Sequence, residues 1–284
     1  MTKKALITGI AGQDGSYLTE YLLSLGYEIH GIVRRHSVAE NQNHRLYKHN
    51  LTENVHTYYG DLLDYPSLVR IVNDVQPDEI YNLGAMSHVR VSFDMPSFTI
   101  QTNALGVLNI LEVYRTICPN AKFYQASSSE MFGLHACNGI LFNHESPRRG
   151  SNFVTNKVVK GAVSIKKGLQ DKLELGNMDS HRDWGHSKDY VRAMHMIINH
   201  ETPDEFIVAT GNTHSVRDLC QVVFDKLDLN YEDYVVQNPK YMRPEELKYL
   251  KGDFSKARSV LGWKPEYTFE TMLDEMIDRW MEEL

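Results

Sequence analysis

The sequence predicts an α/β fold in which a doubly wound parallel sheet is followed by a smaller C-terminal α/β domain. Three observations support this prediction. Short apolar stretches alternate with helical patterns up to residue 142, glycines recur directly after the first stretch, and short strands, loops and helices mix from residue 143 onward. We therefore expect one domain over residues 1–142 and a second mainly over residues 143–284, with some elements returning to the first domain.

The composition is that of a globular chain with an acidic balance. Its 284 residues are 42% hydrophobic and 24% charged, and the formal net charge is −7. This charge argues against binding to nucleic acid or to an anionic membrane, and no apolar run has the length of a membrane span. The three cysteines, Cys118, Cys137 and Cys220, are far apart, which predicts neither a disulfide framework nor a metal site. We expect a cytoplasmic protein.

The first strand is followed by a glycine-rich turn. Lys4 to Thr8 form a short apolar stretch, Gly9, Gly12 and Gly15 follow at a spacing of three, and apolar residues then recur at helical spacing. A strand, a glycine turn and a helix N-terminus together form a cradle for the pyrophosphate of a dinucleotide. The alternative is an ordinary strand–helix turn, but the context that this motif requires is present.

The second strand, Glu28 to Val33, ends in Arg34 and Arg35. In dinucleotide-binding folds an acid at this place binds the 2′-hydroxyl of NAD, whereas arginine accommodates the 2′-phosphate of NADP. The two arginines therefore favour NADP over NAD, and the alternative is a solvated basic turn. Residues 36–54 form a polar stretch, for which we expect a loop with one helical turn.

Three further strands complete the alternating pattern. They are expected at 56–60, 79–83 and 122–126, with helices at 65–75 and 97–116. Asp61 follows the third strand and has two interpretations, an acceptor for the adenine amino group and a cap of the next helix. Small residues from Gly84 onward follow the fourth strand and would let the backbone approach a cofactor.

The sixth predicted strand conflicts with the fifth. It covers Ala136 to Phe142, and only residues 127–135 separate it from the strand before. Two parallel neighbours need a crossover of about a dozen residues or more, usually a helix. Either the topology changes here, or residues are missing from the chain as written.

The second half mixes short elements. Ser215 and Asp218 predict a capping box at the start of a helix. Helices are expected at 153–169, from 187 to 199, at 255–261 and at 269–283, and strands at 173–176 and 205–209.

Long stretches of the chain resemble one enzyme family. The opening run has the sequence Ile-Thr-Gly-Ile-Ala-Gly-Gln-Asp-Gly-Ser-Tyr-Leu, and further matching runs occupy 81–88, 123–130, 138–150, 175–191 and 209–216. Together these runs resemble the GDP-mannose 4,6-dehydratase family of extended short-chain dehydrogenases, over nearly the whole chain. The resemblance implies an NADP-binding Rossmann domain over 1–142 and a mainly GDP-sugar-binding domain over 143–284.

The resemblance also implies a reaction. Members of this family convert GDP-D-mannose to GDP-4-keto-6-deoxy-D-mannose and water, for the synthesis of deoxysugars such as GDP-fucose or GDP-rhamnose. NADP+ accepts a hydride from C4, water is eliminated across C5 and C6, and the hydride returns to C6. By the motif, Ser128 would hydrogen-bond the 4-hydroxyl group. Glu130 would act as base at C5 and as acid toward the 6-hydroxyl group. The alternative for both residues is a cap pair at the strand end.

One family motif is absent. The family places Tyr-x-x-x-Lys on a helix after Ser-x-Glu, and no tyrosine in this sequence is followed four residues later by lysine. Family members carry a few tens of residues more at the position of the Gly133–Leu134 junction. We hypothesise that this segment was omitted and the remainder numbered continuously, and a bonded Cα–Cα distance of about 3.80 Å there would contradict this.

The resemblance implies ligand contacts as well. Positions that match NADP contacts are Gly9, Ile10, Ala11, Gly12, Gln13, Asp14, Arg34, Arg35, His36, Ser37, Asp61, Leu62, Leu83, Gly84, Ala85, Met86, Ser87, Phe98, His144 and Arg149. Phe98 stands where tyrosine is common, so a hydroxyl contact is lost there. Positions that match GDP-mannose contacts are Ser87, Asn143, Val154, Lys157, Arg182, Arg243 and Glu246.

The chemistry of three of these residues fits the substrate. Arg182 and Arg243 are the local cations that a diphosphate requires in an acidic protein, although surface charge is the alternative. Glu246 suits the N1–H and amino edge of guanine.

Two other functions stay open. Another nucleotide-sugar dehydratase, epimerase or reductase of the same superfamily is one, although an epimerase would not need Glu130 and a dTDP-sugar site would not favour Glu246. A non-catalytic NADP-binding protein is the other, if the Tyr-x-x-x-Lys helix is truly deleted. The resemblance further implies a homodimer or homotetramer, in which the Arg34–Arg35 loop reaches the cofactor of a neighbouring subunit.

Overall fold

The chain forms two compact units. The computed structural model describes residues 2–35, 43–86, 89–126, 136–242 and 247–284. One unit comprises Met1–Ile140 with Val191–Phe206, and the other comprises Leu141–Tyr190 with Ile207–Leu284. The division at 140/141 lies close to the expected boundary at 142/143. The assignment of one ligand to each part stays a prediction.

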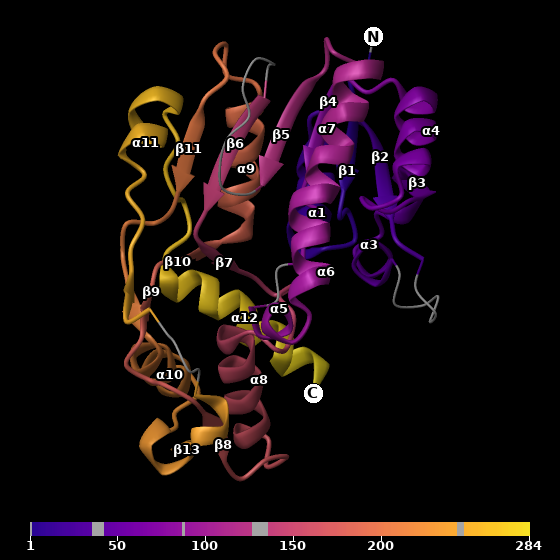
Figure 1. Cartoon of the computed structure of the whole chain (residues 1–284). Helices are drawn as coiled ribbons and strands as arrows, with labels where there is room; N and C mark the ends of the chain where they lie inside the picture. The colour runs from indigo at the N-terminus through magenta and orange to yellow at the C-terminus, as the bar shows by residue number, and fades with distance from the viewer. Residues whose placement is uncertain (1, 36–42, 87–88, 127–135, 243–246) are drawn as a thin grey trace. The chain divides into compact units, whose positions relative to one another are not determined.

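A seven-stranded sheet forms the centre of the first unit (Figure 1). Its strand order is β11-β6-β5-β4-β1-β2-β3, and five neighbouring pairs, from β6 to β3, are parallel. This confirms the predicted doubly wound parallel sheet. The strands are β1 (Lys4–Thr8), β2 (Glu28–Val33), β3 (Val55–Tyr59), β4 (Glu79–Asn82), β5 (Lys122–Ala126), β6 (Ala136–Leu141) and β11 (Glu205–Val208).

Helices cover both faces of this sheet. α4 (Tyr65–Val75) and α7 (Gly106–Ile117) pack together with the strands in one apolar core on one face. The connections that contain α4 and α7 run along the sheet toward β6, whereas the connection from β1 to β2 runs toward β3. Because such crossovers are right-handed, α1 (Gln13–Ser24) lies on the other face. There Tyr21 of α1 contacts His195 of α9 (Ser187–Ile198), with ring centroids 5.6 Å apart.

The long helix expected at 97–116 is three consecutive helical segments. They are α6 (Pro96–Ile100), a π-helical turn (Gln101–Leu105) and α7. The short helices α5 (Val89–Asp94) and α3 (His44–Lys48) precede them in the chain. A π-turn adds one residue to a helical turn and changes the face that the following residues present.

The second unit is built from short strands around three helices. Its apolar core joins α8 (Val154–Lys166), α10 (Val216–Asp225) and α12 (Phe269–Glu283). The Ser215–Asp218 capping box is confirmed at the start of α10. The other elements are β7 (Asn143–Glu145), β8 (Leu173–Leu175), β9 (His181–Arg182), β10 (Trp184–His186), β12 (His214–Ser215), β13 (Val235–Gln237), β14 (Tyr249–Leu250) and α11 (Ser255–Leu261).

The junction between β5 and β6 is the unusual feature of the first unit. The two strands are parallel neighbours, with Phe123 opposite Ala136 and Ala126 opposite Gly139. A change of topology, one of the two explanations offered above, is therefore wrong. Residues 127–135, including the Gly133–Leu134 junction, lie outside the described residues, so the Cα–Cα distance does not decide the second explanation.

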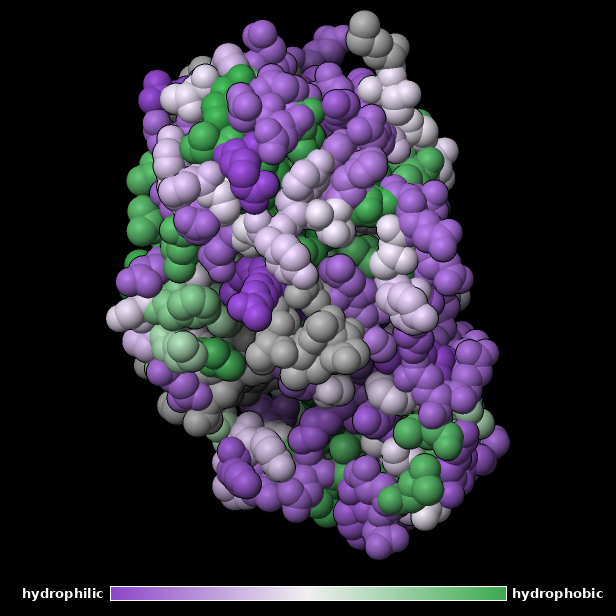
Figure 2. Space-filling model, turned by 90° about the vertical axis from the view of Figure 1, so that its right-hand side faces the viewer, coloured by the Kyte–Doolittle hydropathy of each residue, from purple (hydrophilic) through white to green (hydrophobic). Residues whose placement is uncertain are grey.

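The surface is mainly hydrophilic on the face drawn in Figure 2, where hydrophobic residues form small separate groups. In the part of the chain that the structure describes, no helix is long and apolar enough to cross a membrane. The cysteines Cys118, Cys137 and Cys220 are free thiols and are buried.

Candidate active site

The glycine turn connects β1 to α1 in a conformation that requires glycine. Gly9 has a φ of +69°, a left-handed conformation that glycine adopts without strain. A β-carbon on Gly15 would lie 2.4 Å from the carbonyl oxygen of Gly9 and 2.6 Å from Cα of Ile10. Gly15 therefore allows α1 to pack directly against the turn.

Gly12 differs from the other two glycines. It is the N-cap residue of α1, where no side chain caps the helix. Among the described residues beyond its chain neighbours and its own helix, a β-carbon there would approach the oxygen of Gly9 at 3.0 Å, which is closer than most β-carbons come to another atom. Gly12 therefore lets the chain stay close to the Gly9 carbonyl group at the start of α1, and a helix N-terminus attracts anions.

A row of buried polar side chains fixes the carboxyl edge of the sheet. The Thr8 hydroxyl donates to Asn82 Oδ1 over 2.5 Å, and Asn82 Nδ2 donates to Gln125 Oε1 over 2.7 Å. Thr8 Oγ1 also accepts the N–H of Gly84 over 2.9 Å. The row links β1, β4 and β5 where their loops begin. The sequence reasoning missed it, although polar residues at the ends of apolar strands were a signal.

Two further contacts shape this edge. Asn103 Oδ1 accepts the N–H of Met86 over 2.8 Å, and Asn103 Nδ2 donates to the carbonyl oxygen of Met86 over 3.1 Å. Arg45 of α3 donates to the carbonyl oxygen of Ala11 in the glycine turn over 3.2 Å. Neither Asn103 nor Arg45 was singled out from the sequence.

The arginines and Asp61 lie at strand ends of the same sheet. Arg34 and Arg35 follow β2 directly and are exposed. Asp61 Oδ1 accepts the N–H of Leu63 over 2.9 Å, whereas the N-cap residue of α4 is Asp64. The interpretation of Asp61 as the helix cap is therefore wrong, because its carboxylate closes the turn before the helix.

Several expected site residues lie outside the described residues or away from this turn. Phe98 is half-buried in α6, and Leu62 is buried in the core. His144 stacks on Tyr190 at 4.5 Å, and Arg149 forms an ion pair with Glu145 over 3.0 Å, both in the second unit. The structure does not describe Ser128, Glu130, His36, Ser37, Ser87, Arg243 and Glu246.

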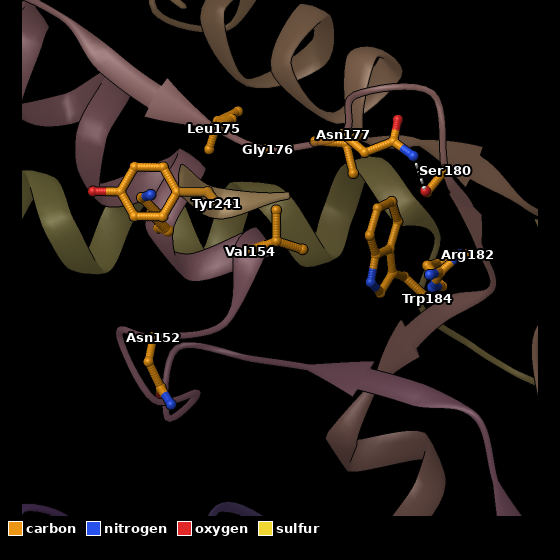
Figure 3. A pocket seen from close by; sticks show the side chains of 11 residues that line it. Asn152, Val154, Leu175, Gly176, Asn177, Ser180, Arg182, Trp184 and Tyr241 are labelled. Atoms are coloured by element: carbon orange, nitrogen blue, oxygen red, sulfur yellow. Dashed lines mark hydrogen bonds between the residues drawn. The ribbon is translucent and has the colours of Figure 1, made fainter. Parts of the chain in front are cut away.

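A pocket of the second unit contains three of the expected substrate residues (Figure 3). Its volume is about 210 Å³, and Val154, Lys157 and Arg182 line it, whereas Asn143 does not. The lining residues that the sequence reasoning missed are Asn152, Leu175, Gly176, Asn177, Ser180, Trp184, Val216 and Tyr241.

Arg182 is held at the pocket by backbone contacts. Its Nη1 donates to the carbonyl oxygens of Leu247 over 2.7 Å and His181 over 2.8 Å. The next residue, Asp183, is fully buried, and its carboxylate accepts the N–H groups of Thr210, Gly211 and Gly252 over 2.8, 2.9 and 3.2 Å. These contacts fix the strand that presents the guanidinium group to the pocket.

The sequence profile described as GDP-mannose 4,6 dehydratase matches residues 6–135 and 132–276. The chain belongs to this family. GDP-mannose 4,6 dehydratase 2 of Arabidopsis thaliana is 45% identical over 325 residues, which cover 99% of this chain and 87% of that protein. The Homo sapiens GDP-mannose 4,6 dehydratase is 40% identical over 334 residues, covering 96% and 90%.

Solved structures show the fold that the family shares with other enzymes. A UDP-glucose 4-epimerase from Thermotoga maritima with UDP-glucose has a TM-score of 0.83 at 20% identity, covering 99% of both chains. RMD from Pseudomonas aeruginosa complexed with NADPH has a TM-score of 0.78 at 22% identity, covering 100% of both chains. At these identities the likeness concerns the fold alone.

The family match changes segment between β5 and β6. The two matched segments meet at residues 132–135, within the connection that joins these strands. An alignment of 325 residues is also longer than the 284-residue chain, so the Arabidopsis thaliana relative carries residues that this chain lacks.

Proposed function

We propose that the protein converts GDP-D-mannose to GDP-4-keto-6-deoxy-D-mannose and water. The observation that carries this proposal is the match to curated GDP-mannose 4,6-dehydratases at 40–45% identity over nearly the whole chain. The parallel strand ends, the glycine turn and a pocket lined by Lys157 and Arg182 support it, because a nucleotide-sugar enzyme requires such features.

The first unit has the features that NADP(H), the cofactor of this family, requires. The glycine turn and the N-terminus of α1, whose N-cap residue Gly12 carries no side chain, suit a pyrophosphate. Arg34 and Arg35 are exposed at the end of β2, where a 2′-phosphate would be met. When bound, NADP+ would supply a reversible hydride acceptor.

The second unit supplies contacts for the GDP part of the substrate. Arg182 presents a guanidinium group to the pocket, and a planar guanidinium matches the geometry of phosphate oxygens. In a chain of net charge −7, such local cations are needed to bind a diphosphate.

Ser128 and Glu130 follow β5 in the sequence, and we assign them the family roles. Ser128 hydrogen-bonds the 4-hydroxyl group. Glu130 removes the C5 proton and delivers a proton to the departing 6-hydroxyl group. The buried row that ends at Gln125 supports this proposal, because it fixes the strand that precedes both residues in the sequence.

The absent Tyr-x-x-x-Lys pair is assigned to a segment that is missing from the chain as written. Three observations support this. β5 and β6 are parallel neighbours joined by residues 127–135 alone. The family match changes segment at this place, and the relatives carry additional residues.

The exposed side of α7 supports the same assignment. The connection from β4 to β5, which contains α7, and the connection from β5 to β6 run in the same direction along the sheet. A right-handed crossover from β5 to β6 would therefore lie on the same face as α7. In Figure 1 no described helix lies over β5 and β6 on that face. Ile100, Leu105 and Leu108 on the helical segments leading into and within α7 are 67%, 47% and 54% exposed.

Two versions of the protein test the proposal. The full-length protein with its complete β5–β6 connection is expected to form the 4-keto product from GDP-mannose and NADP+. The 284-residue chain is expected to bind NADP+ and GDP but to form no product, because it lacks the tyrosine that removes the 4-hydroxyl proton. Intact-protein mass spectrometry establishes which version the source makes.

A non-catalytic NADP-binding protein is the second candidate. The absence of any Tyr-x-x-x-Lys sequence in the 284 residues favours it. It would be supported if the natural protein has the length of the chain as written, binds NADP+ and leaves GDP-mannose unchanged. Assembly as a homodimer or homotetramer stays a prediction, for which light scattering of the purified protein is the measurement.

A further inference from the structure

The pocket of the second unit has two ends of different chemistry. Figure 3 shows Arg182 and Trp184 at one end and Tyr241 at the other, with Val154 between them. The guanidinium end suits a diphosphate. The end at Tyr241 combines an aromatic ring with the ammonium group of Lys157, which lies 4.0 Å from the ring centroid.

The ammonium group of Lys157 is held in one place. Lys157 Nζ donates to the carbonyl oxygen of Glu174 over 2.6 Å and faces the Tyr241 ring. Fixing a lysine side chain on a ligand costs rotamer entropy, and these contacts restrict the side chain before a ligand binds. An ammonium group has three N–H donors, so these two contacts leave one direction for a ligand acceptor.

Tyr241 is fixed to the strand that also carries Glu174. Its turn, Pro239–Tyr241, follows Asn238, whose N–H donates to the carbonyl oxygen of Leu175 over 2.8 Å. Asn238 Nδ2 donates to Glu174 Oε2 over 3.0 Å. A β-carbon on Gly176 would lie 2.4 Å from the carbonyl oxygen of Tyr241, so the two backbones are in direct contact.

We propose that Tyr241 is a positioning residue that selects the base of the substrate. By holding the ammonium group of Lys157 at this end of the pocket, it directs an N–H donor toward the O6 and N7 acceptors of guanine. Adenine has an amino donor at the same edge, which would face the ammonium group unfavourably. This inference rests on the proposed function, because it assumes a guanine nucleotide in the pocket.

Stacking of the base on Tyr241 is the competing explanation, since this residue is 45% exposed. Stacking would contribute equally to guanine and adenine, because each base has a π-face. The positioning role, in contrast, acts through Lys157 and increases the affinity for GDP more than the affinity for ADP.

Calorimetric titration of the protein with GDP and with ADP tests the inference, and it requires no turnover. Wild type is expected to bind GDP more tightly than ADP. Tyr241→Phe keeps the ring and is expected to keep both affinities. Tyr241→Leu removes the ring face and is expected to weaken GDP binding about three- to tenfold, with ADP binding changed less than about twofold.

The variant Lys157→Met supplies the coupling measurement. If Tyr241 acts through Lys157, Tyr241→Leu causes no further loss of GDP affinity in the Lys157→Met background. The temperature of thermal unfolding and NADP+ affinity verify that each variant is folded.

Four outcomes would overturn the inference. Equal loss of GDP and ADP affinity in Tyr241→Leu would assign the ring to stacking. Additive losses in the double variant would separate Tyr241 from Lys157. Wild type that does not bind GDP would contradict the proposed function as well, whereas normal GDP binding by Tyr241→Leu would contradict the inference alone.

Discussion

At the scale of single residues, Gly12 and Gly15 of the glycine turn differ in how closely a β-carbon would meet the protein. A β-carbon on Gly15 would overlap the backbone of Gly9 and Ile10, whereas a β-carbon on Gly12 would come to 3.0 Å from the Gly9 oxygen. The three glycines look equivalent in the sequence because spacing alone does not show which of them faces protein atoms.

Two alanine substitutions test this difference. Gly15→Ala is expected to destabilise the protein by about 2 kcal/mol, because its β-carbon overlaps the Gly9 carbonyl oxygen. Gly12→Ala is expected to cost less stability than Gly15→Ala, because its β-carbon comes no closer than 3.0 Å to the Gly9 oxygen, but to bind NADP+ at least about tenfold more weakly, since its methyl group would lie at the proposed pyrophosphate site. Urea unfolding and NADP+ titration measure the two effects. Unchanged NADP+ affinity in Gly12→Ala would contradict the assignment of the cradle.

Arg182 provides the corresponding test in the second unit. Arg182→Lys keeps the charge but loses the planar guanidinium group that reaches the carbonyl oxygens of Leu247 and His181. We expect GDP affinity to fall about tenfold while NADP+ affinity is unchanged. Calorimetric titration with both ligands is the measurement, and wild-type GDP affinity in the variant would argue against a phosphate contact.

At the scale of elements, most helices and strands follow from periodicity and capping, and the exceptions have local causes. The helices at 255–261 and 269–283 and the strand at 28–33 have the expected bounds. The helix expected at 97–116 is interrupted by a π-turn, whose extra residue leaves no signal in apolar spacing. Strand β7 was missed because a three-residue strand is too short to show alternation.

The candidate site was predictable only in part for a related reason. The glycine turn is a local motif, so its residues were identified from a contiguous sequence. The pocket brings together α8, β8, β9 and the turn before residue 242, and such long-range neighbours leave no pattern in the chain. Val154, Lys157 and Arg182 were found through family resemblance, whereas Tyr241 required the structure.

Asp183 is expected to be the main polar support of the elements around the pocket. Asp183→Asn replaces an acceptor-only carboxylate by a group with an N–H2 donor, which would face the N–H groups of Gly211 and Gly252. We expect a loss of about 3 kcal/mol in the free energy of unfolding. Urea unfolding is the measurement, and a loss below about 0.5 kcal/mol would show that the carboxylate is not a structural support.

At the scale of the whole molecule, the free energy of unfolding should depend on pH through the carboxylate of Glu275. Hydrogen bonds from His186 and Lys188, against partial burial, lower the pKa of Glu275 to about 2. The unfolded-state pKa is about 4.3. Because the folded pKa is the lower one, this stabilisation is present above pH about 4.3 and is lost as the pH falls toward about 2.

Glu275→Gln tests this dependence. The variant is expected to be about 1 kcal/mol less stable at pH 7, the value typical of a partly exposed ion pair. Its stability should also fall less steeply than that of wild type below pH about 4.3. Urea unfolding over a series of pH values measures both effects. Parallel curves for variant and wild type would assign the acid dependence to other carboxylates.

The reaction itself is tested most directly with GDP-mannose that carries deuterium at C4. The full-length protein is incubated with this substrate and NADP+, and the product is examined by NMR and mass spectrometry. We predict a 4-keto-6-deoxy product with the deuterium at C6 and no net accumulation of NADPH. Unchanged GDP-mannose, or an oxidised sugar formed together with one equivalent of reduced cofactor, would contradict the proposed dehydratase function.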